Sequence, residues 1–291
     1  MNELKTIGVV GAGQMGGGIA QVAAVSNHRV MVFDPIPGAL GRCQDGHNKR
    51  LAREVEKGRM KDVEMSAALG RIHYIANIDD LKGADIVIEA IVEDAATKKQ
   101  LFTKLAKMFT GNQVLASNTS SISITEIAAA AEAAHAGTAE RVIGMHFFNP
   151  VPIMKLVEVI KGLQTSAQTT ERVIALATHL GKTAIPANDR PGFVSNRVLM
   201  PMINEAFYAW MEGVAEPRHL DEIMKLGCNF PMGPLNLADF IGLDTCVHIM
   251  DVLADGLNND RYRACPLLKQ LVTAGRLGDK AGRGVYEYPQ K

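Results

Sequence analysis

The sequence lacks the features that usually mark a metal protein, a membrane protein or a nucleic-acid-binding protein. Its 31 Lys and Arg residues balance its 31 Asp and Glu residues, so no net field attracts nucleic acid or an anionic membrane. No uninterrupted apolar run approaches the roughly 20 residues that span a bilayer. The four cysteines show neither a C-x-x-C pair nor a metal-ligand spacing. We therefore expect no metal site, no membrane segment and no nucleic-acid partner.

We also expect no leader peptide, because the opening residues MNELKTIGVVGAG pass almost directly into a predicted buried strand. Cysteines without a pairing pattern are typical of a reducing compartment. The apolar fraction of 47% and the charged fraction of 21% are those of a globular protein. We expect a cytoplasmic protein whose 291 residues form one large domain or two ordinary ones.

The first two-thirds of the sequence alternate short β-rich runs with helical patterns. The predicted strands are TIGVVGAG, HRVMVFD, ADIVIEAI, QVLASN, RVIGMHFF, MKLVEVI and KTAIPAND. Helical patterns separate most of them, near residues 14–24, 37–57, 62–69, 95–109, 124–134 and 168–180. Near-continuous Val and Ile runs between helices indicate a mostly parallel sheet covered on both faces. The predicted fold class is therefore α/β, with a Rossmann-type sheet.

The pattern changes after DRPGF. From Phe193 onward, long apolar-periodic segments punctuated by Gly and Pro replace the β-branched strands. This predicts a smaller all-α domain of about 100 residues, an ordinary domain size. We place the boundary at Arg190–Pro191, which gives a Rossmann-type domain over residues 1–190 and a helical domain over residues 191–291.

A glycine-rich motif, Gly11-x-Gly13-x-x-Gly16, follows the first predicted strand and opens the first helix. The first glycine permits a tight turn, the second lets a pyrophosphate approach the backbone, and the third allows helix and strand to pack closely. The N–H groups and dipole at the helix start then hold the phosphates. The expected dinucleotide-binding residues are Gly11, Ala12, Gly13, Gln14, Met15 and Gly16. The glycine spacing alone would also fit a turn that binds no ligand.

Asp34 supports the dinucleotide interpretation and selects the cofactor. It ends the second predicted strand, 18 residues after Gly16, where the motif expects an acidic residue that binds the adenosine ribose. Its carboxylate repels a 2′-phosphate, and the following residues PIPGAL contain no Arg or Lys to compensate. We therefore expect NAD rather than NADP.

The stretch MHFFNPVPIMKLVEV places two ionisable residues, His146 and Glu158, within apolar runs. Side chains alternate along a strand, so Glu158 shares a face with Leu156 and Ile160, where an unpaired carboxylate is costly. Beside a nicotinamide cofactor, a histidine can take the hydroxyl proton of an alcohol while hydride leaves its carbon. A carboxylate on the other ring nitrogen then fixes the tautomer. A buried pair that only joins two strands is the structural alternative.

Five segments together closely resemble the 3-hydroxyacyl-CoA dehydrogenase family: GAGQMGGGIA, IVIEAIVED, LASNTSSISI, GMHFFNPVPIMKLVEVIKG and PGFVSNRVLMPMINEA. The resemblance covers essentially the whole chain and is closest to the bacterial short-chain members that act on 3-hydroxybutyryl-CoA. It implies NAD-dependent oxidation of an (S)-3-hydroxyacyl-CoA to its 3-ketoacyl-CoA, and the reverse reduction. It also implies a homodimer formed through the helical C-terminal domain.

The resemblance further implies roles for individual residues. His146 would be the catalytic base, or the acid in the reductive direction, with Glu158 as its partner. Ser120 and Asn196 match positions that hydrogen-bond substrate and cofactor near the reacting oxygen, although their residue types also fit a turn and a helix N-cap. Further cofactor contacts would be four residues that otherwise suit a solvated surface: Glu93, Lys98, Asn149 and Lys280.

Coenzyme A carries a 3′-phosphate and a pyrophosphate, which favour cationic partners. The segment NKRLAREVEKGRMK is rich in such residues, and its Arg50 and Lys57 lie seven residues apart on one predicted helical face. They fall where the resembling family contacts the coenzyme, so we expect both to bind the acyl-CoA substrate. An exposed charged helix face is the alternative.

Two other functions fit parts of the pattern. A related dehydrogenase that acts on a free hydroxy acid such as L-gulonate would share much of it. A protein that binds NAD without catalysis would also keep the fold. The intact set of His146, Glu158, Ser120 and Asn196 argues against a non-catalytic protein.

Overall fold

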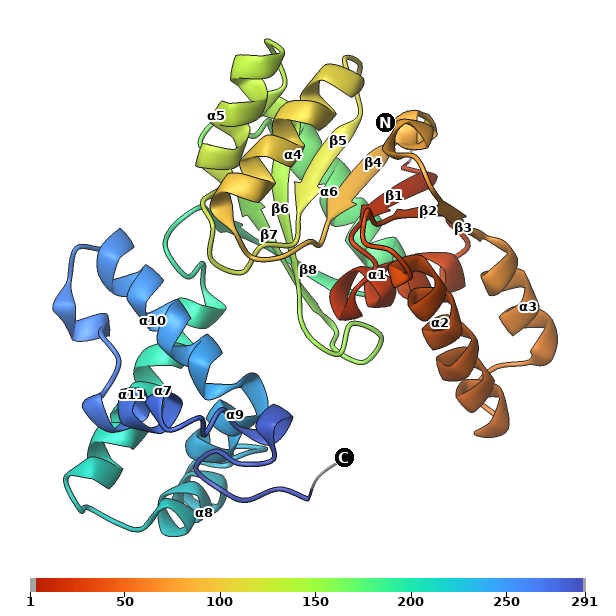
Figure 1. The fold of residues 1–291 in the computed structure, drawn as a ribbon. Coiled ribbons are helices and arrows are strands. Elements are labelled where there is room, and N and C mark those ends of the chain that lie inside the picture. The colour runs from red at the N-terminus through yellow and green to blue at the C-terminus, as the bar shows by residue number, and fades with distance from the viewer. Residues whose placement is uncertain (1–3, 290–291) are drawn as a thin grey trace. The chain divides into compact units, whose positions relative to one another are not determined.

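The chain divides into two compact units, Met1–Asp189 and Arg190–Lys291. A computed structural model describes residues 4–289 of it. Residues 1–3, on which the expected absence of a leader partly depends, lie outside the described residues. The first unit is a sheet covered by helices and the second is helical, so the predicted fold class is confirmed (Figure 1).

An eight-stranded sheet forms the centre of the first unit, in the order β3-β2-β1-β4-β5-β6-β7-β8 (Figure 1). Neighbouring strands are parallel except for β6 and β7, which are antiparallel. The sheet is therefore mostly parallel, as predicted. The strands are β1 (Thr6–Val10), β2 (Arg29–Phe33), β3 (Ile72–Ile75), β4 (Ile86–Glu89), β5 (Val114–Ser117), β6 (Val142–Phe147), β7 (Leu156–Lys161) and β8 (Thr183–Asn188).

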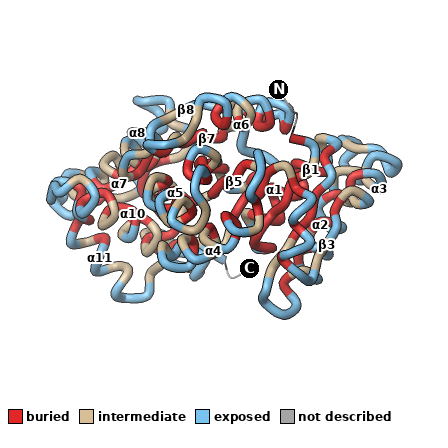
Figure 2. Tube along the Cα trace, turned by 90° about the horizontal axis from the view of Figure 1, so that it is seen from above, coloured by how far each residue is buried: buried red, intermediate tan, exposed pale blue. Residues whose placement is uncertain are grey.

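Helices cover both faces of the sheet, with α4 and α5 side by side on one face and α1 and α6 on the other (Figure 1). Ile7 and Val9 of β1 belong to one buried cluster with Ile19 of α1 and Leu176 of α6. The central strands and α1 are accordingly buried, whereas α3 is largely exposed (Figure 2). The helices are α1 (Gln14–Val25), α2 (Ala39–Glu56), α3 (Asp62–Gly70), α4 (Ala95–Met108), α5 (Ile124–Ala134) and α6 (Ala167–His179).

β3 has no counterpart among the strands predicted from the sequence. It is four residues long, lies at the edge of the sheet, and buries only Ile72 fully. In the sequence, the segment RIHYI shows neither a continuous apolar run nor a clear alternation of apolar and polar residues. Its strand conformation comes from pairing with β2, in which Val30 lies opposite Ile72 and Phe33 opposite Ile75.

The second unit consists of helices around their own apolar core. Met200, Ile203 and Phe207 of α7 pack in one buried cluster with residues of α9, α10 and α11. Within residues 4–289, none of the helices is both long and apolar enough to cross a membrane. The helices are α7 (Ser195–Met211), α8 (Pro217–Cys228), α9 (Pro234–Ile241), α10 (Leu243–Gly256) and α11 (Pro266–Thr273).

Candidate active site at the carboxyl edge of the sheet

The predicted site residues of the first unit follow the ends of parallel strands, which meet at one edge of the sheet. The glycine turn follows β1, Glu93 follows β4, and Ser120 follows β5. His146 lies near the end of β6, which is parallel to β5. Open α/β sheets bind their ligands outside this edge. The topology therefore gathers residues from four parts of the chain in one region.

The glycine turn between β1 and α1 has one glycine that packing does not explain. Gly11 has φ +107°, and a Cβ there would collide with the carbonyl oxygen of Ala90. A Cβ on Gly16 would collide with the carbonyl oxygen of Gly11. A Cβ on Gly13, in contrast, would meet no protein atom within 4 Å. The open space beside Gly13 at the N-terminus of α1 fits a pyrophosphate that approaches the backbone.

Asp34 lines a cavity of about 350 Å³ beside the glycine turn. Its Oδ2 accepts a hydrogen bond from the Ala12 amide at 2.7 Å, and its Oδ1 accepts one from the Ile36 amide at 2.8 Å. These two bonds fix the carboxylate beside the turn. The cavity is also lined by Arg42 and Arg50 of α2. Arg42 was not expected there: it lies in the first turn of α2, and only the folding of that helix brings it to the cavity.

His47 of α2 contacts α1, the helix that follows the glycine turn. Its Nε2 donates to the carbonyl oxygen of Gly17 at 2.7 Å, because a carbonyl can only accept. Its Nδ1 therefore accepts from the Tyr74 hydroxyl at 2.6 Å. Burial lowers the pKa of His47 by more than the Gly17 carbonyl raises it. The neutral ring thus connects α1 and α2 through hydrogen bonds. Nothing in the sequence indicates this role.

His146 and Glu158 lie directly opposite each other on the antiparallel strands β6 and β7. The His146 Nδ1 lies 2.7 Å from the Glu158 Oε2, and both residues are buried. The His146 ring also packs against Phe148, with 4.7 Å between the ring centroids. Since a carboxylate accepts, Nδ1 donates to Glu158, and in the neutral form of the ring Nε2 would carry the lone pair. The structure thus supplies the partner that a carboxylate on an apolar strand requires.

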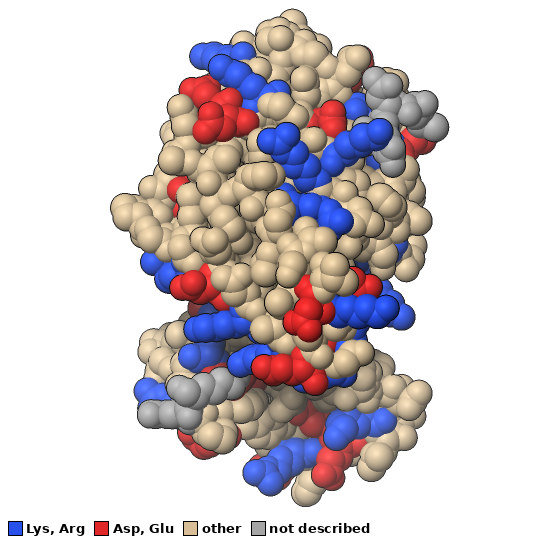
Figure 3. Space-filling model, turned by 90° about the vertical axis from the view of Figure 1, so that its right-hand side faces the viewer, with Lys and Arg blue, Asp and Glu red and all other residues tan. Residues whose placement is uncertain are grey.

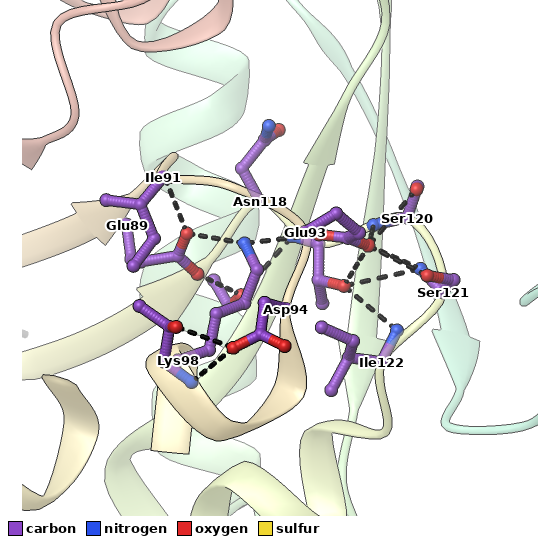
Figure 4. Close-up of polar contacts among 12 residues, drawn as sticks. Glu89, Ile91, Glu93, Asp94, Lys98, Asn118, Ser120, Ser121 and Ile122 are labelled. Atoms are coloured by element: carbon purple, nitrogen blue, oxygen red, sulfur yellow. Dashed lines mark hydrogen bonds and ion pairs between the residues drawn. The ribbon is translucent and has the colours of Figure 1, made fainter. Parts of the chain in front are cut away.

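Glu93 organises the turn that carries Ser120 (Figure 4). Its Oε1 accepts five hydrogen bonds from this turn: the amides of Ser120 and Ser121 and the hydroxyls of Thr119, Ser120 and Ser121. The Ser120 hydroxyl makes the longest of them, at 3.2 Å. Burial raises the pKa of Glu93, but Lys98 and the hydrogen bonds from the turn lower it below its ordinary value overall. The carboxylate is therefore ionised and holds the turn in one conformation.

Lys98 lies inside the first unit. Only 1% of its surface is exposed, which contradicts the alternative of a solvated surface residue. Its Nζ lies 2.5 Å from the Glu89 Oε1 and 3.2 Å from the Glu93 Oε2 (Figure 4). Glu89 is completely buried and also accepts from the Ser117 hydroxyl at 2.6 Å and the Ile91 amide at 2.8 Å. We did not expect a role for Glu89, although an acidic residue at the end of a buried strand was a signal for one.

Gln14 and Asn149, two further residues that were expected to contact the cofactor, contact each other at the glycine turn. The Gln14 side-chain amide donates to the Asn149 Oδ1 at 2.9 Å. The Asn118 Oδ1 accepts from the Phe147 amide at 2.9 Å, which joins the turn after β5 to the end of β6. The segments after β1, β5 and β6 are therefore connected by side-chain hydrogen bonds.

Arg50 and Lys57 line a second cavity of about 790 Å³, together with Arg53, Arg59 and Lys182. Arg50 donates to the Gln21 Oε1 at 2.6 Å and also lines the cavity beside the glycine turn. From the side of α2 and α3, basic and acidic side chains are interspersed with uncharged surface (Figure 3). On this side of the molecule, the cations therefore form no continuous basic face.

Asn196 and Lys280 belong to the helical unit. Asn196 is buried in the first turn of α7, whose N-cap is Val194, so the alternative of a helix N-cap is wrong for Asn196. The Lys280 Nζ lies 2.6 Å from the Asp244 Oδ1 and 2.8 Å from its Oδ2, and the lysine side chain is about half exposed. Among residues 4–289, no group of three His, Cys, Asp or Glu side chains is arranged to hold a metal ion.

Comparisons with known proteins agree with this arrangement. Residues 6–190 match the family model for "3-hydroxyacyl-CoA dehydrogenase, NAD binding domain", and residues 192–288 match the model for "3-hydroxyacyl-CoA dehydrogenase, C-terminal domain". A probable 3-hydroxybutyryl-CoA dehydrogenase of Bacillus subtilis is 54% identical over 289 residues, which cover 99% of each chain. One of Deinococcus radiodurans is 54% identical over 281 residues, covering 97% of this chain and 99% of the relative.

A solved structure shows the same similarity. The crystal structure of (S)-3-hydroxybutyryl-CoA dehydrogenase from Ralstonia eutropha matches with a TM-score of 0.94 and 47% sequence identity. The match covers 99% of this chain and 100% of that one. Sequence and structure comparisons therefore point to the same group of proteins over both units.

Proposed function

Since the chain belongs to the 3-hydroxyacyl-CoA dehydrogenase family, we propose that it oxidises (S)-3-hydroxybutyryl-CoA to the 3-keto thioester with NAD, and catalyses the reverse reduction. The names of the relatives that match over nearly the full chain support this substrate. The observation that carries the proposal is the buried His146–Glu158 pair at the edge of the sheet where the glycine turn lies. We propose further that the enzyme works in the cytoplasm.

The glycine turn and Asp34 are the residues that would hold the dinucleotide. The open space beside Gly13 suits the pyrophosphate, and the fixed Asp34 carboxylate suits the adenosine ribose. When bound, NAD supplies the acceptor for the hydride that leaves the hydroxyl-bearing carbon. Gln14 and Asn149, joined to each other beside the turn, are proposed as further contacts.

His146 removes the hydroxyl proton in the oxidative direction. With its Nδ1 proton donated to Glu158, the Nε2 lone pair is the base, and Glu158 stabilises the imidazolium as it forms. In the reductive direction, the imidazolium returns the proton to the developing alkoxide. Burial of the pair strengthens this electrostatic coupling because little water screens it.

Ser120 donates a hydrogen bond to the reacting oxygen as charge develops on it. Its hydroxyl makes the longest of the five bonds to the Glu93 Oε1, and Glu93 keeps four donors if that hydroxyl turns to substrate. The exchange therefore has a low cost. We assign the second donor to Asn196 from the family resemblance. We extend the same assignment to Glu93, Lys98 and Lys280 as residues that shape the cofactor site.

Arg50 and Lys57 are proposed to bind the phosphates of coenzyme A. They line one cavity large enough for part of the coenzyme, and Arg53 and Lys182 add further positive charge to it. The acidic Glu54 in this cavity is already neutralised by Arg59, which pairs with it at 2.6 Å. The cavity therefore keeps an excess of positive charge.

A homodimer through the helical unit completes the proposal. α8 exposes an apolar stripe in which Ile223 and Leu226 lie about one turn apart, and Leu226 is 85% exposed. Large exposed aliphatic residues on one helix face are typical of a protein–protein contact. A second copy of this chain is the proposed partner.

An absorbance assay tests the function directly. Purified protein with acetoacetyl-CoA should oxidise NADH, with NADPH a much poorer donor. We expect His146→Gln to lower kcat by roughly 10²- to 10⁴-fold because the proton donor is lost, while the Kd for NADH stays unchanged. His73→Gln, at an exposed residue of the edge strand β3, is the control and should retain the wild-type kcat.

Three results would contradict the proposal. Turnover of a free hydroxy acid such as L-gulonate without turnover of the thioester would select the alternative dehydrogenase. NAD binding without turnover of either would indicate a non-catalytic protein. Full activity of His146→Gln would remove the histidine from the chemistry.

A further inference from the structure

One cation of the cavity of about 790 Å³ differs from its neighbours in burial. Arg53 and Lys57, which line this cavity, are exposed, whereas only 8% of the surface of Lys182 is exposed. Lys182 lies between α6 and β8, so it reaches the cavity from a different part of the chain than the cations of the α2 region. Removal of a lysine from water is costly, so its burial requires a reason.

The partners of the Lys182 ammonium are neutral. Its Nζ donates to the carbonyl oxygen of Val151 at 2.5 Å and to that of Met154 at 2.8 Å. Among residues 4–289, no Asp or Glu forms an ion pair with it, and burial lowers the pKa of Lys182 below its ordinary value. An ammonium has three N–H donors. The two carbonyls therefore leave one donor and a positive charge that no carboxylate compensates.

The same cavity combines positive charge with aliphatic surface. Val25 and Ile153 both line it, and they are 42% and 72% exposed. A ligand that suits such a wall carries an anionic group next to a chain that can cover apolar atoms. Coenzyme A has this chemistry, because its phosphates are joined to the pantetheine arm.

The protein fixes the Lys182 ammonium before any ligand binds. Its two acceptors belong to the segment between β6 and β7, which joins His146 to Glu158. Val151 of this segment is 2% exposed, and a Cβ on Gly18 of α1 would collide with it. The segment is thus packed on α1 and holds the ammonium in place. A cation fixed in this way loses less conformational entropy on binding an anion than an exposed side chain does.

We propose that Lys182 donates its remaining N–H to a phosphate of coenzyme A and is the pre-positioned cation of the coenzyme site. This inference rests on the proposed function for the identity of the ligand. The bound phosphate supplies the negative charge that the protein does not place beside this lysine. A charge-assisted hydrogen bond from a buried ammonium is also screened less by solvent and salt than a contact with an exposed cation.

The test compares two thioesters, one with phosphates and one without. Acetoacetyl-pantetheine has the reacting group and the pantetheine arm of acetoacetyl-CoA but lacks the phosphates and the adenosine. We expect Lys182→Met to lower the ratio of kcat/KM for acetoacetyl-CoA to kcat/KM for acetoacetyl-pantetheine by about 10- to 100-fold, as for loss of a hydrogen bond to a charged group. The ratio is insensitive to a disturbance of the segment between β6 and β7, because such a disturbance affects both substrates.

Two further variants complete the test. Lys155→Met is the matched control, because Lys155 is an exposed lysine of the same segment and is not one of the residues that line the cavity. It removes the same charge and should keep the wild-type ratio. Lys182→Gln covers the case in which Lys182→Met does not fold, since an amide can still donate to a carbonyl of the segment but carries no charge. It should lower the ratio as Lys182→Met does.

Calorimetry with free coenzyme A and with dephospho-CoA identifies the phosphate. Lys182→Gln should bind coenzyme A about tenfold or more weakly than wild type, with an unchanged Kd for NADH. If the contact is with the 3′-phosphate, wild type and variant bind dephospho-CoA equally. If the contact is with the pyrophosphate, the variant binds dephospho-CoA more weakly as well. Either pattern supports the inference.

Other outcomes would overturn it. An equal loss of activity on both thioesters, with unchanged binding of coenzyme A, would show that Lys182 only holds the segment. Wild-type kinetics in both Lys182 variants would remove the residue from the coenzyme site. A wild-type protein that binds coenzyme A without reducing acetoacetyl-CoA would overturn the proposed function, and the affinity of Lys182→Gln for coenzyme A would then decide the inference by itself.

Discussion

Buried ionisable side chains in the first unit obtain their partners from other elements of the fold. Glu158 of β7 meets His146 of β6, and Lys98 of α4 meets Glu89 of β4. A charge inside an apolar interior requires such a partner, so a Glu within a strand pattern signals one. The partner of Glu158 was predictable because it lies 12 residues away in the same motif. The partner of Lys98 was not, because a lysine on a helix usually faces solvent.

His47 gives a pH-dependent prediction. Its folded-state pKa lies below the ordinary value of 6.5, so below pH 6.5 the unfolded chain binds a proton that the folded protein does not. The free energy of unfolding should therefore fall as pH is lowered from 6.5, by at most about 1.4 kcal/mol per pH unit from this group. Urea titrations of wild type and His47→Gln between pH 7 and 5 measure the difference.

The His47→Gln variant serves as the reference because glutamine can still donate to the Gly17 carbonyl without titrating. Its stability should therefore decline less than that of wild type over this range. Parallel declines in both proteins would show that His47 does not contribute to the pH dependence.

A substitution of Lys57 tests the proposed coenzyme site separately from the proposed dinucleotide site. It lines only the larger cavity, whereas Arg50 lines both. Lys57→Glu should raise the KM for acetoacetyl-CoA about tenfold, because a charge-assisted contact becomes a repulsion, and should leave the KM for NADH unchanged. Lys104→Glu makes the same charge change on the exposed face of α4 and should leave both constants unchanged. Equal KM values for acetoacetyl-CoA in Lys57→Glu and wild type would remove Lys57 from the site.

At the scale of elements, Gly16 of α1 and Gly41 of α2 differ in whether packing requires a glycine. Gly16 opens α1 where a Cβ would collide with the backbone of the preceding turn. Gly41 lies in the first turn of α2 with no heavy atom within 4 Å of an added Cβ. The first glycine is required by packing against the turn, and the second is not required by packing at all.

Alanine at these two positions should therefore have opposite effects. Gly41→Ala should stabilise the protein by about 0.5–1 kcal/mol, because alanine restricts the unfolded chain and favours helix. Gly16→Ala should distort the turn and lose the rise in melting temperature that NAD confers on wild type. Thermal unfolding with and without NAD measures both effects. A normal NAD-induced rise in Gly16→Ala would show that the turn tolerates the Cβ.

At the scale of the whole molecule, the two units use different architectures for different purposes. The first unit positions ligand-binding segments at the edge of a mostly parallel sheet. The second unit has its own buried core and exposes an apolar stripe on α8. Exposed apolar residues add nothing to the buried core of their own unit. We therefore assign this stripe to the proposed dimer.

Leu226→Glu tests the dimer. A charge at the centre of an apolar contact should shift the protein from dimer to monomer at micromolar concentration, measured by size-exclusion chromatography with light scattering. Val63→Glu is the matched control, because Val63 is an exposed aliphatic residue on α3 of the other unit, at 69% exposure. It should elute as wild type. A wild-type protein that is already monomeric would contradict the dimer.

The sequence by itself determined the fold class, the glycine turn and the identity of the His146–Glu158 pair. These features depend on local periodicity and on residues close together in the chain, and both can be read from the sequence. The tertiary structure alone decided that β3 joins the sheet, that Arg42 lines the cavity beside the glycine turn and that Lys98 is buried between Glu89 and Glu93. Each of these depends on contacts between segments far apart in sequence, and only the packing of helices on the sheet defines those contacts.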